Sequence, residues 1–97
     1  MSMLQYIEGR LTYNSTNRMY GMVSIGFDPK TGFIDVWECD GFHPEDYLEV
    51  WMDNQWLPTY MNIDRDGEWY LMCTPYVGDL EAVPVRILRR YRKGAGI

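Results

Sequence analysis

The chain contains few of the residues on which catalysis, metal binding and membrane insertion usually depend. Its 97 residues include two cysteines and one histidine. No apolar run approaches the roughly 18 residues that a membrane-spanning helix needs. The first residues, MSMLQYIEGR, lack the charged segment and the apolar run of a secretory signal. We therefore expect a cytoplasmic protein.

The cysteines and the histidine are too few and too scattered for a metal site. Cys39 and Cys73 lie in separate strand-like segments without CxxC spacing, and together with His43 they fall short of the four ligands of a structural zinc ion. We expect no metal and no cofactor. In a reducing compartment both cysteines are predicted to be buried free thiols, with a disulfide as the alternative. No Ser or Cys nucleophile neighbours His43, so a catalytic triad is not indicated.

Helical periodicity is missing as well, because no long stretch repeats apolar residues every 3.6 positions. Short extended runs take its place. They are clearest in residues 47–72, where runs rich in Trp, Tyr, Val, Ile and Leu are separated by polar turns at 53–55 and 64–67. This pattern predicts a three-stranded antiparallel meander. Pro58 cannot donate to a strand ladder, so we expect it at an edge or a bulge.

Alternation of apolar and polar residues extends the strand prediction to both sides of the meander. The additional strands are expected at residues 7–13, 19–27, 33–39 and 83–88, the last of which would close the sheet. A hydrophobic fraction of 46% and an aromatic fraction of 15% are typical of one globular domain. The sequence thus predicts an all-β domain of six to seven short antiparallel strands, folded as a small barrel or a strongly bent two-sheet roll. This domain would span residues 1–88, followed by a basic tail at 89–97.

A specific order of motifs marks residues 41–87. An acidic strand, a short turn, a Trp followed by Pro and Thr, an Asp-Gly turn and Trp-Tyr-Leu lead to a terminal Val-Arg-Ile strand. The segments that carry this order are LEVWMDNQWLPTYMNIDRDGEWYLM and LEAVPVRI. They resemble a family of small bacterial and phage-associated domains of unknown function. The resemblance implies an SH3-like barrel and a phage or mobile-element setting, and it brings no catalytic residues.

The net charge of −5 conceals a strong asymmetry along the chain. Residues 1–85 contain all 14 acidic residues and four Lys or Arg, a net charge of −10. Residues 86–97 contain five Lys or Arg and no acid, a net charge of +5. We therefore expect the body of the domain to repel nucleic acid, whereas its end can attract an anionic surface.

The tryptophans that flank the first turn of the meander indicate a contact surface for another protein. Trp51 and Trp56 can pair across a tight hairpin, and exposed aromatic rings anchor many interfaces. Nearby acidic residues would steer a basic partner. The ordinary alternatives are rings buried in the core, as we expect for Trp69, and a solvated acidic face that aids solubility. The predicted partner-binding residues are Trp51, Trp56, Tyr60, Glu45, Asp46, Glu49 and Asp53.

The sequence therefore favours a non-enzymatic protein–protein interaction module that docks on a basic partner. One concrete form is a phage or mobile-element inhibitor of a nucleic-acid enzyme. The alternative is a nucleic-acid-binding accessory protein, because an Arg-rich segment with a stackable Tyr suits phosphate and base contacts. A strand end folded against its own acidic body, or a solvated tail, would explain the same segment without nucleic acid. The residues of this alternative are Arg86, Arg89, Arg90, Tyr91, Arg92 and Lys93.

Overall fold

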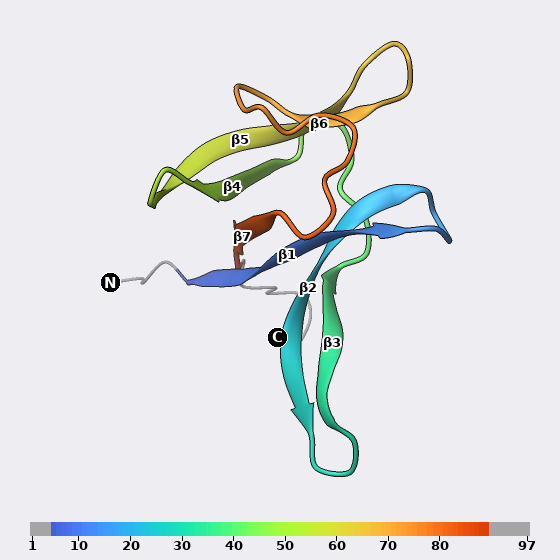
Figure 1. Cartoon of the computed structure of the whole chain (residues 1–97), viewed down its shortest axis with the longest axis vertical. Helices are drawn as coiled ribbons and strands as arrows, with labels where there is room; N and C mark the ends of the chain where they lie inside the picture. Colours follow the sequence, from blue (N-terminus) through green and yellow to red (C-terminus); the bar gives the residue numbers. More distant parts are fainter. Residues whose placement is uncertain (1–4, 90–97) are drawn as a thin grey trace, which may run out of the picture.

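The computed structural model describes residues 5–89, and this part of the chain contains seven strands and no helix (Figure 1). The strands are β1 (Tyr6–Asn14), β2 (Met19–Asp28), β3 (Gly32–Cys39), β4 (Tyr47–Met52), β5 (Gln55–Ile63), β6 (Trp69–Leu71) and β7 (Pro84–Leu88). The predicted all-β class is confirmed. Within residues 5–89, no helix has the length and apolar character required to cross a bilayer.

All strands join one antiparallel sheet in the order β3-β2-β1-β7-β4-β5-β6. β7 lies between β1 and β4, so it links the N-terminal strands to the meander. The two end strands, β3 and β6, are not neighbours, and the sheet stays open. The fold is thus a strongly bent roll. The expectation that residues 83–88 would close the sheet is wrong, because β7 is a central strand.

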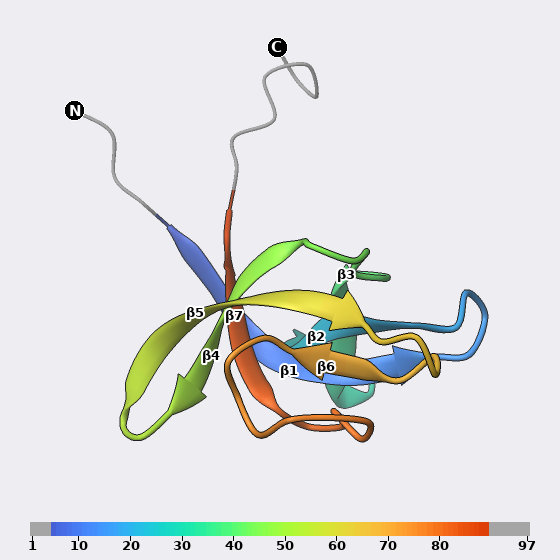
Figure 2. The same cartoon turned by 90° about the horizontal axis from the view of Figure 1, so that it is seen from above.

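The bend brings the β1–β2 half of the sheet opposite the β4-β5-β6 half, and the core lies between them (Figures 1 and 2). Both halves contribute side chains from every second position, as the period of two requires. Leu80 and Val83, from the segment between β6 and β7, complete the cluster, and Trp69 packs against it from β6. The remaining buried members are Leu11, Tyr20, Met22, Phe42, Leu48, Val50, Met61, Leu71 and Val85.

The β4–β5 turn fixes how the meander displays its aromatic side chains. Asp53 and Asn54 have φ angles of 56° and 61°. Two consecutive positive φ angles are typical of the two-residue turn whose twist matches that of a hairpin. As a result Trp51 lies directly opposite Trp56. Pro58 is confirmed at an edge position, because β6 pairs only with the end of β5 beyond it.

The β2–β3 hairpin projects from the body of the molecule (Figure 1). β1 pairs with β2 up to Val23 and then with β7, so the outer half of β2 has only β3 beside it. The register of β2 and β3 also shifts between Met22 and Val23. Ile25 and Phe27 are consequently 68% and 65% exposed, although both continue the apolar alternation of the strand.

The two cysteines are free thiols in different surroundings. Cys39 is half-buried at the end of β3, and burial raises the pKa of its thiol. Cys73 is exposed, in a turn with a φ of 64°. The prediction of two buried thiols is therefore wrong for Cys73, because β6 ends at Leu71 and the chain turns outward directly after it.

Candidate functional site: an aromatic face on the meander

The outer face of β4 and β5 carries two aromatic pairs. The ring centroids of Tyr47 and Tyr60 are 5.6 Å apart, and those of Trp51 and Trp56 are 5.2 Å apart, with interplanar angles of 68° and 65°. Edge-to-face packing of this kind adds about 0.5–1.5 kcal/mol per pair beyond simple burial. Pro58 lies between the pairs, opposite Glu49. We call Tyr47, Trp51, Trp56, Pro58 and Tyr60 the aromatic face.

The aromatic face is accessible to solvent. Tyr47, Trp51 and Tyr60 are 47%, 41% and 45% exposed, and Trp56 is half-buried. Trp51, Trp56 and Tyr60 are thus brought together, as expected. Sequence reasoning did not propose Tyr47 for the site, although its period-two position on β4 puts it on the face of Trp51.

Arg86 of β7 lies at the centre of this face. It belongs to a cross-strand row that runs from Glu8 of β1 through Arg86 and Glu49 to Pro58 of β5. Its Nε and Nη2 atoms each lie 2.7 Å from Oε1 of Glu49. Its guanidinium carbon is 3.7 Å from the ring centroid of Tyr6 and 4.7 Å from that of Trp56. The side chains of Arg86 and Glu49 are only 21% and 13% exposed. The planar guanidinium of Arg86 therefore stacks on the rings of Tyr6 and Trp56 while it pairs with the carboxylate of Glu49.

This arrangement changes the roles open to Glu49 and Arg86. The carboxylate of Glu49 is neutralised by Arg86, so it contributes little to attraction at a distance. The hydroxyl of Tyr47 also donates a hydrogen bond to Oε2 of Glu49 at 2.9 Å, which raises the pKa of Tyr47. The guanidinium of Arg86 is in turn occupied by a carboxylate and two rings, and it is not presented to a phosphate.

The other predicted acids lie at the two ends of the aromatic face. Asp53 is exposed in the β4–β5 turn, and exposed Glu45 lines a shallow depression with Tyr60. Asp46 is half-buried and accepts a hydrogen bond of 2.8 Å from the backbone N–H of His43. Glu45 and Asp53 make no ion pair with any residue of the described range 5–89. These two carboxylates are therefore the predicted acids that remain available to a partner.

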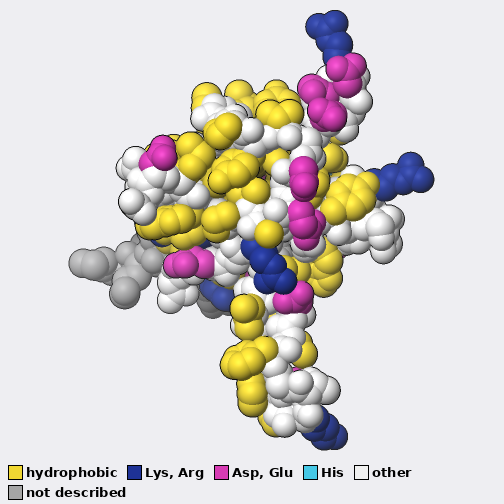
Figure 3. All heavy atoms as spheres, viewed as in Figure 1, with side chains coloured by type: hydrophobic (Ala, Val, Ile, Leu, Met, Phe, Trp, Pro, Cys, Tyr) yellow, Lys and Arg dark blue, Asp and Glu magenta, His cyan; other side chains and the backbone are white. Residues whose placement is uncertain are grey.

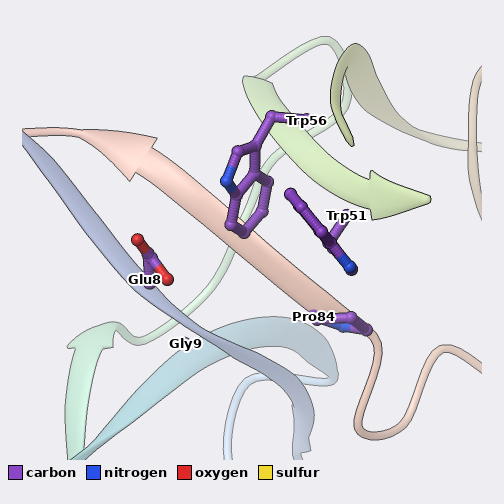
Figure 4. Close-up of a pocket in the computed structure, with 5 residues that line it drawn as sticks. All are labelled: Glu8, Gly9, Trp51, Trp56 and Pro84. Carbon is purple, nitrogen blue, oxygen red and sulfur yellow. The ribbon is translucent and has the colours of Figure 1, made fainter. Parts of the chain in front are cut away.

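An open depression of about 410 Å³ adjoins the aromatic face (Figure 4). Trp51 and Trp56 form one side, Pro84 of β7 lies at its end, and Glu8 and Gly9 of β1 form the other side. Glu8 is exposed and has no ion-pair partner within residues 5–89. An unpaired carboxylate beside exposed indole rings suits a Lys or Arg side chain of another molecule. Sequence reasoning missed Glu8 because it is far from the meander along the chain.

The residues of the nucleic-acid alternative are only partly covered by the structure. Arg89 is exposed, and its backbone N–H donates to the carbonyl of Gln5 at 2.7 Å. The predicted residues Arg90, Tyr91, Arg92 and Lys93 lie outside the described residues.

Residues 9–87 match the family model of a domain of unknown function, DUF5348. The chain belongs to this family. The match extends the resemblance seen in residues 41–87 to the three N-terminal strands. No curated protein and no solved structure matches the chain. The SH3-like barrel and the bacterial or phage origin stay predictions.

The DUF5348 match covers most of the site. All of β4 and β5 and all of β7 except Leu88 fall within residues 9–87, and with them the aromatic face, Glu49 and Arg86. Tyr6 and Glu8 precede the matched range. Among residues 5–89, no three His, Cys, Asp or Glu side chains gather closely enough to hold a metal ion.

Proposed function

We propose that this DUF5348 domain is a non-enzymatic protein-interaction module that docks on a basic surface of another protein. The observation that carries the proposal is the aromatic face, where four of five residues are exposed although a partly buried ion pair packs against the same face. Large rigid rings lose little conformational entropy on binding, and they anchor protein interfaces for that reason.

The charge of the domain supports a basic partner. Residues 5–89 contain 14 acids and six Lys or Arg, a net charge of −8. Glu8, Glu45 and Asp53 border the aromatic face and have no ion-pair partner within the described residues. A field of this sign raises the rate at which a basic surface is encountered, and the rings then determine how long it stays. A phage or mobile-element inhibitor of a nucleic-acid enzyme is one form of this function, since such an enzyme has a basic surface of its own.

Capture of partners from host lysate, followed by measured binding to the recovered protein, tests the proposal. Trp51→Ala should weaken capture roughly ten-fold or more, because truncated interface aromatics commonly cost 2 kcal/mol or above. Trp37→Ala is the matched control: it removes the same side chain from a similarly exposed position, 47% against 41%, on β3. Asp53→Lys should slow association without unfolding the domain. Glu49→Lys is unsuitable as a charge reversal, because it would leave Arg86 without its partner.

Equal capture by the Trp51 variant and the wild-type chain would remove the aromatic face from consideration. Circular dichroism must show that the variants are folded. High salt should reduce the association rate for the wild-type chain, and somewhat less for Asp53→Lys, which changes the net charge of residues 5–89 from −8 to −6.

The nucleic-acid alternative stays a prediction that concerns Arg89 and the residues after it. Oligonucleotide binding at low salt, compared between the intact chain and a chain without residues 89–97, tests it separately. Absence of binding by the intact chain would end this alternative.

A further inference from the structure

The β2–β3 hairpin carries the three most exposed large hydrophobic side chains of the described chain. Phe33 is 79% exposed, Ile25 68% and Phe27 65%. Trp37, Ile34 and Val36 are 47%, 41% and 37% exposed. Both faces of the hairpin are involved, because Ile34 and Val36 alternate with Phe33 and Trp37 along β3. The space-filling view shows apolar side chains gathered along this projection (Figure 3).

The outer edge of β3 is also unpaired. Within residues 5–89, β3 has β2 as its single strand neighbour and forms one end of the sheet. Its sequence, GFIDVWEC, contains no Lys or Pro, which proteins often place on an exposed edge, and its charged residues are Asp35 and Glu38. A two-stranded hairpin with two exposed apolar faces has marginal stability alone and gains from a further strand. This edge therefore has the properties of a strand-pairing interface.

We propose that the hairpin pairs with a second copy of the same chain, β3 against β3, about a two-fold axis. The product is a continuous four-stranded antiparallel sheet that joins two domains. This interface is separate from the aromatic face, and it leaves that face free on both copies.

The net charge of the hairpin favours a second copy of this chain over the basic protein that we propose for the aromatic face. The hairpin carries Asp28, Lys30, Asp35 and Glu38, and Arg10 of β1 bonds both carboxylate oxygens of Asp35 at 2.9 Å. These five charges sum to −1, so the hairpin is close to neutral, although residues 5–89 carry −8. A basic protein gains little electrostatic attraction here. Two acidic chains, in contrast, can approach each other at this position with the least repulsion.

The position of Asp35 selects the register of the pairing. Centring the axis on Asp35 would set two carboxylates directly opposite each other, which is unfavourable. With the axis at Ile34, Val36 would already face Gly32, the first residue of β3, so the paired segment would be short. With the axis at Val36, Asp35 faces Trp37 of the other copy and the two Val36 side chains meet. The aromatic side of both hairpins then forms one continuous stripe, with no like charges opposed in the central pairs.

The new contact is small, because edge pairing covers only the outer edge of β3 and leaves both faces of the hairpin outside it. Ile25 and Phe27 of β2 stay outside the contact. A standard interface covers roughly 800 Å² per partner, and a single strand edge supplies less than that. We therefore expect a weak, reversible dimer that forms only at high chain concentrations.

Sedimentation or light-scattering mass measurements on the full chain over a range of concentrations test the pairing. The wild-type chain should reach twice the monomer mass. Val36→Lys places two ammonium groups opposite each other on the axis, and it should weaken the dimer roughly ten-fold or more. Ile25→Lys is the matched control, because it adds the same charge to a more exposed position on β2, away from the paired edge. That variant should remain dimeric.

Charge complementation provides the sharpest measurement. A mixture of the Val36→Lys chain with a Val36→Glu chain should recover the dimer mass, since the opposed side chains then attract. A wild-type chain that stays monomeric at every concentration would overturn the proposal. So would open-ended assembly, dissociation by Ile25→Lys but not by Val36→Lys, or a mixture that stays monomeric while each folded variant has wild-type circular dichroism.

Discussion

Replacing Arg86 with alanine should strongly destabilise this domain, although the residue lies on the outer face of the sheet. The substitution removes the hydrogen bond and the ion-pair contact to Glu49 and the two ring contacts with Tyr6 and Trp56. It also leaves the Glu49 carboxylate, 13% exposed, without its cation. The effect is therefore a loss of contacts together with a desolvated charge that has no ion-pair partner.

The magnitude follows from these contributions. A hydrogen bond to a charged group contributes about 1.5–3 kcal/mol, and each cation–π contact about 0.5–1 kcal/mol where water has partial access. Removal of one member of a fully buried ion pair costs about 3–5 kcal/mol, and partial exposure lowers that figure here. We expect Arg86→Ala to reduce the free energy of unfolding by about 2–4 kcal/mol. For a domain of this size the melting temperature should fall by roughly 10–25 °C.

A double-mutant cycle with Glu49→Ala separates the ion pair from the ring contacts. The two single substitutions should together cost more than the double substitution, with a coupling energy of about 1–2 kcal/mol. Urea unfolding, followed by tryptophan fluorescence and by circular dichroism, measures all four chains. Arg86→Lys should recover only part of the loss, because an ammonium group cannot stack and bond in the same plane.

Arg10→Ala is the matched control for this cycle. Arg10 also pairs with a carboxylate, that of Asp35, but their side chains are 38% and 61% exposed. Its loss should cost less than about 1 kcal/mol, as is usual for exposed pairs. The reasoning would be refuted if Arg86→Ala cost no more than Arg10→Ala, or if the Glu49 and Arg86 substitutions were additive.

Three further predictions concern the core, a close strand approach and the thiols. Leu71→Ala should reduce the free energy of unfolding by about 2–5 kcal/mol in urea unfolding, because the side chain is fully buried in the core. Gly9→Ala should be poorly folded by circular dichroism, since the added Cβ would lie 2.1 Å from the carbonyl oxygen of Val23; normal folding would show that β1 and β2 do not approach so closely. In the folded protein a thiol reagent should modify exposed Cys73 quickly and Cys39 slowly. Because burial raises the pKa of Cys39, less of it is thiolate at a given pH, and its reaction rate should keep rising at pH values above the ordinary thiol pKa; equal rates for both thiols would contradict this.

Much of the candidate site was accessible from the sequence because it lies on one hairpin. A two-residue turn and the period of two are local properties, and they suffice to place Trp51 opposite Trp56. Local patterns could not show that Glu49 would be neutralised, since Arg86 is 37 residues away along the chain. Glu8 was missed for the same reason. Its place beside the two tryptophans depends on the order of strands in the sheet, which alternation does not encode.

The amino-acid sequence by itself determined the all-β class, the strand positions and most turns, because alternation and turn chemistry act over a few neighbouring residues. Only the tertiary structure decided that β7 is central, that the sheet stays open, and that the β2–β3 hairpin stands clear of the body. An apolar strand residue looks the same in sequence whether or not another layer covers it. Whether Phe33 becomes core or surface therefore depends on where the sheet bends, and that is settled by the packing of residues distant along the chain.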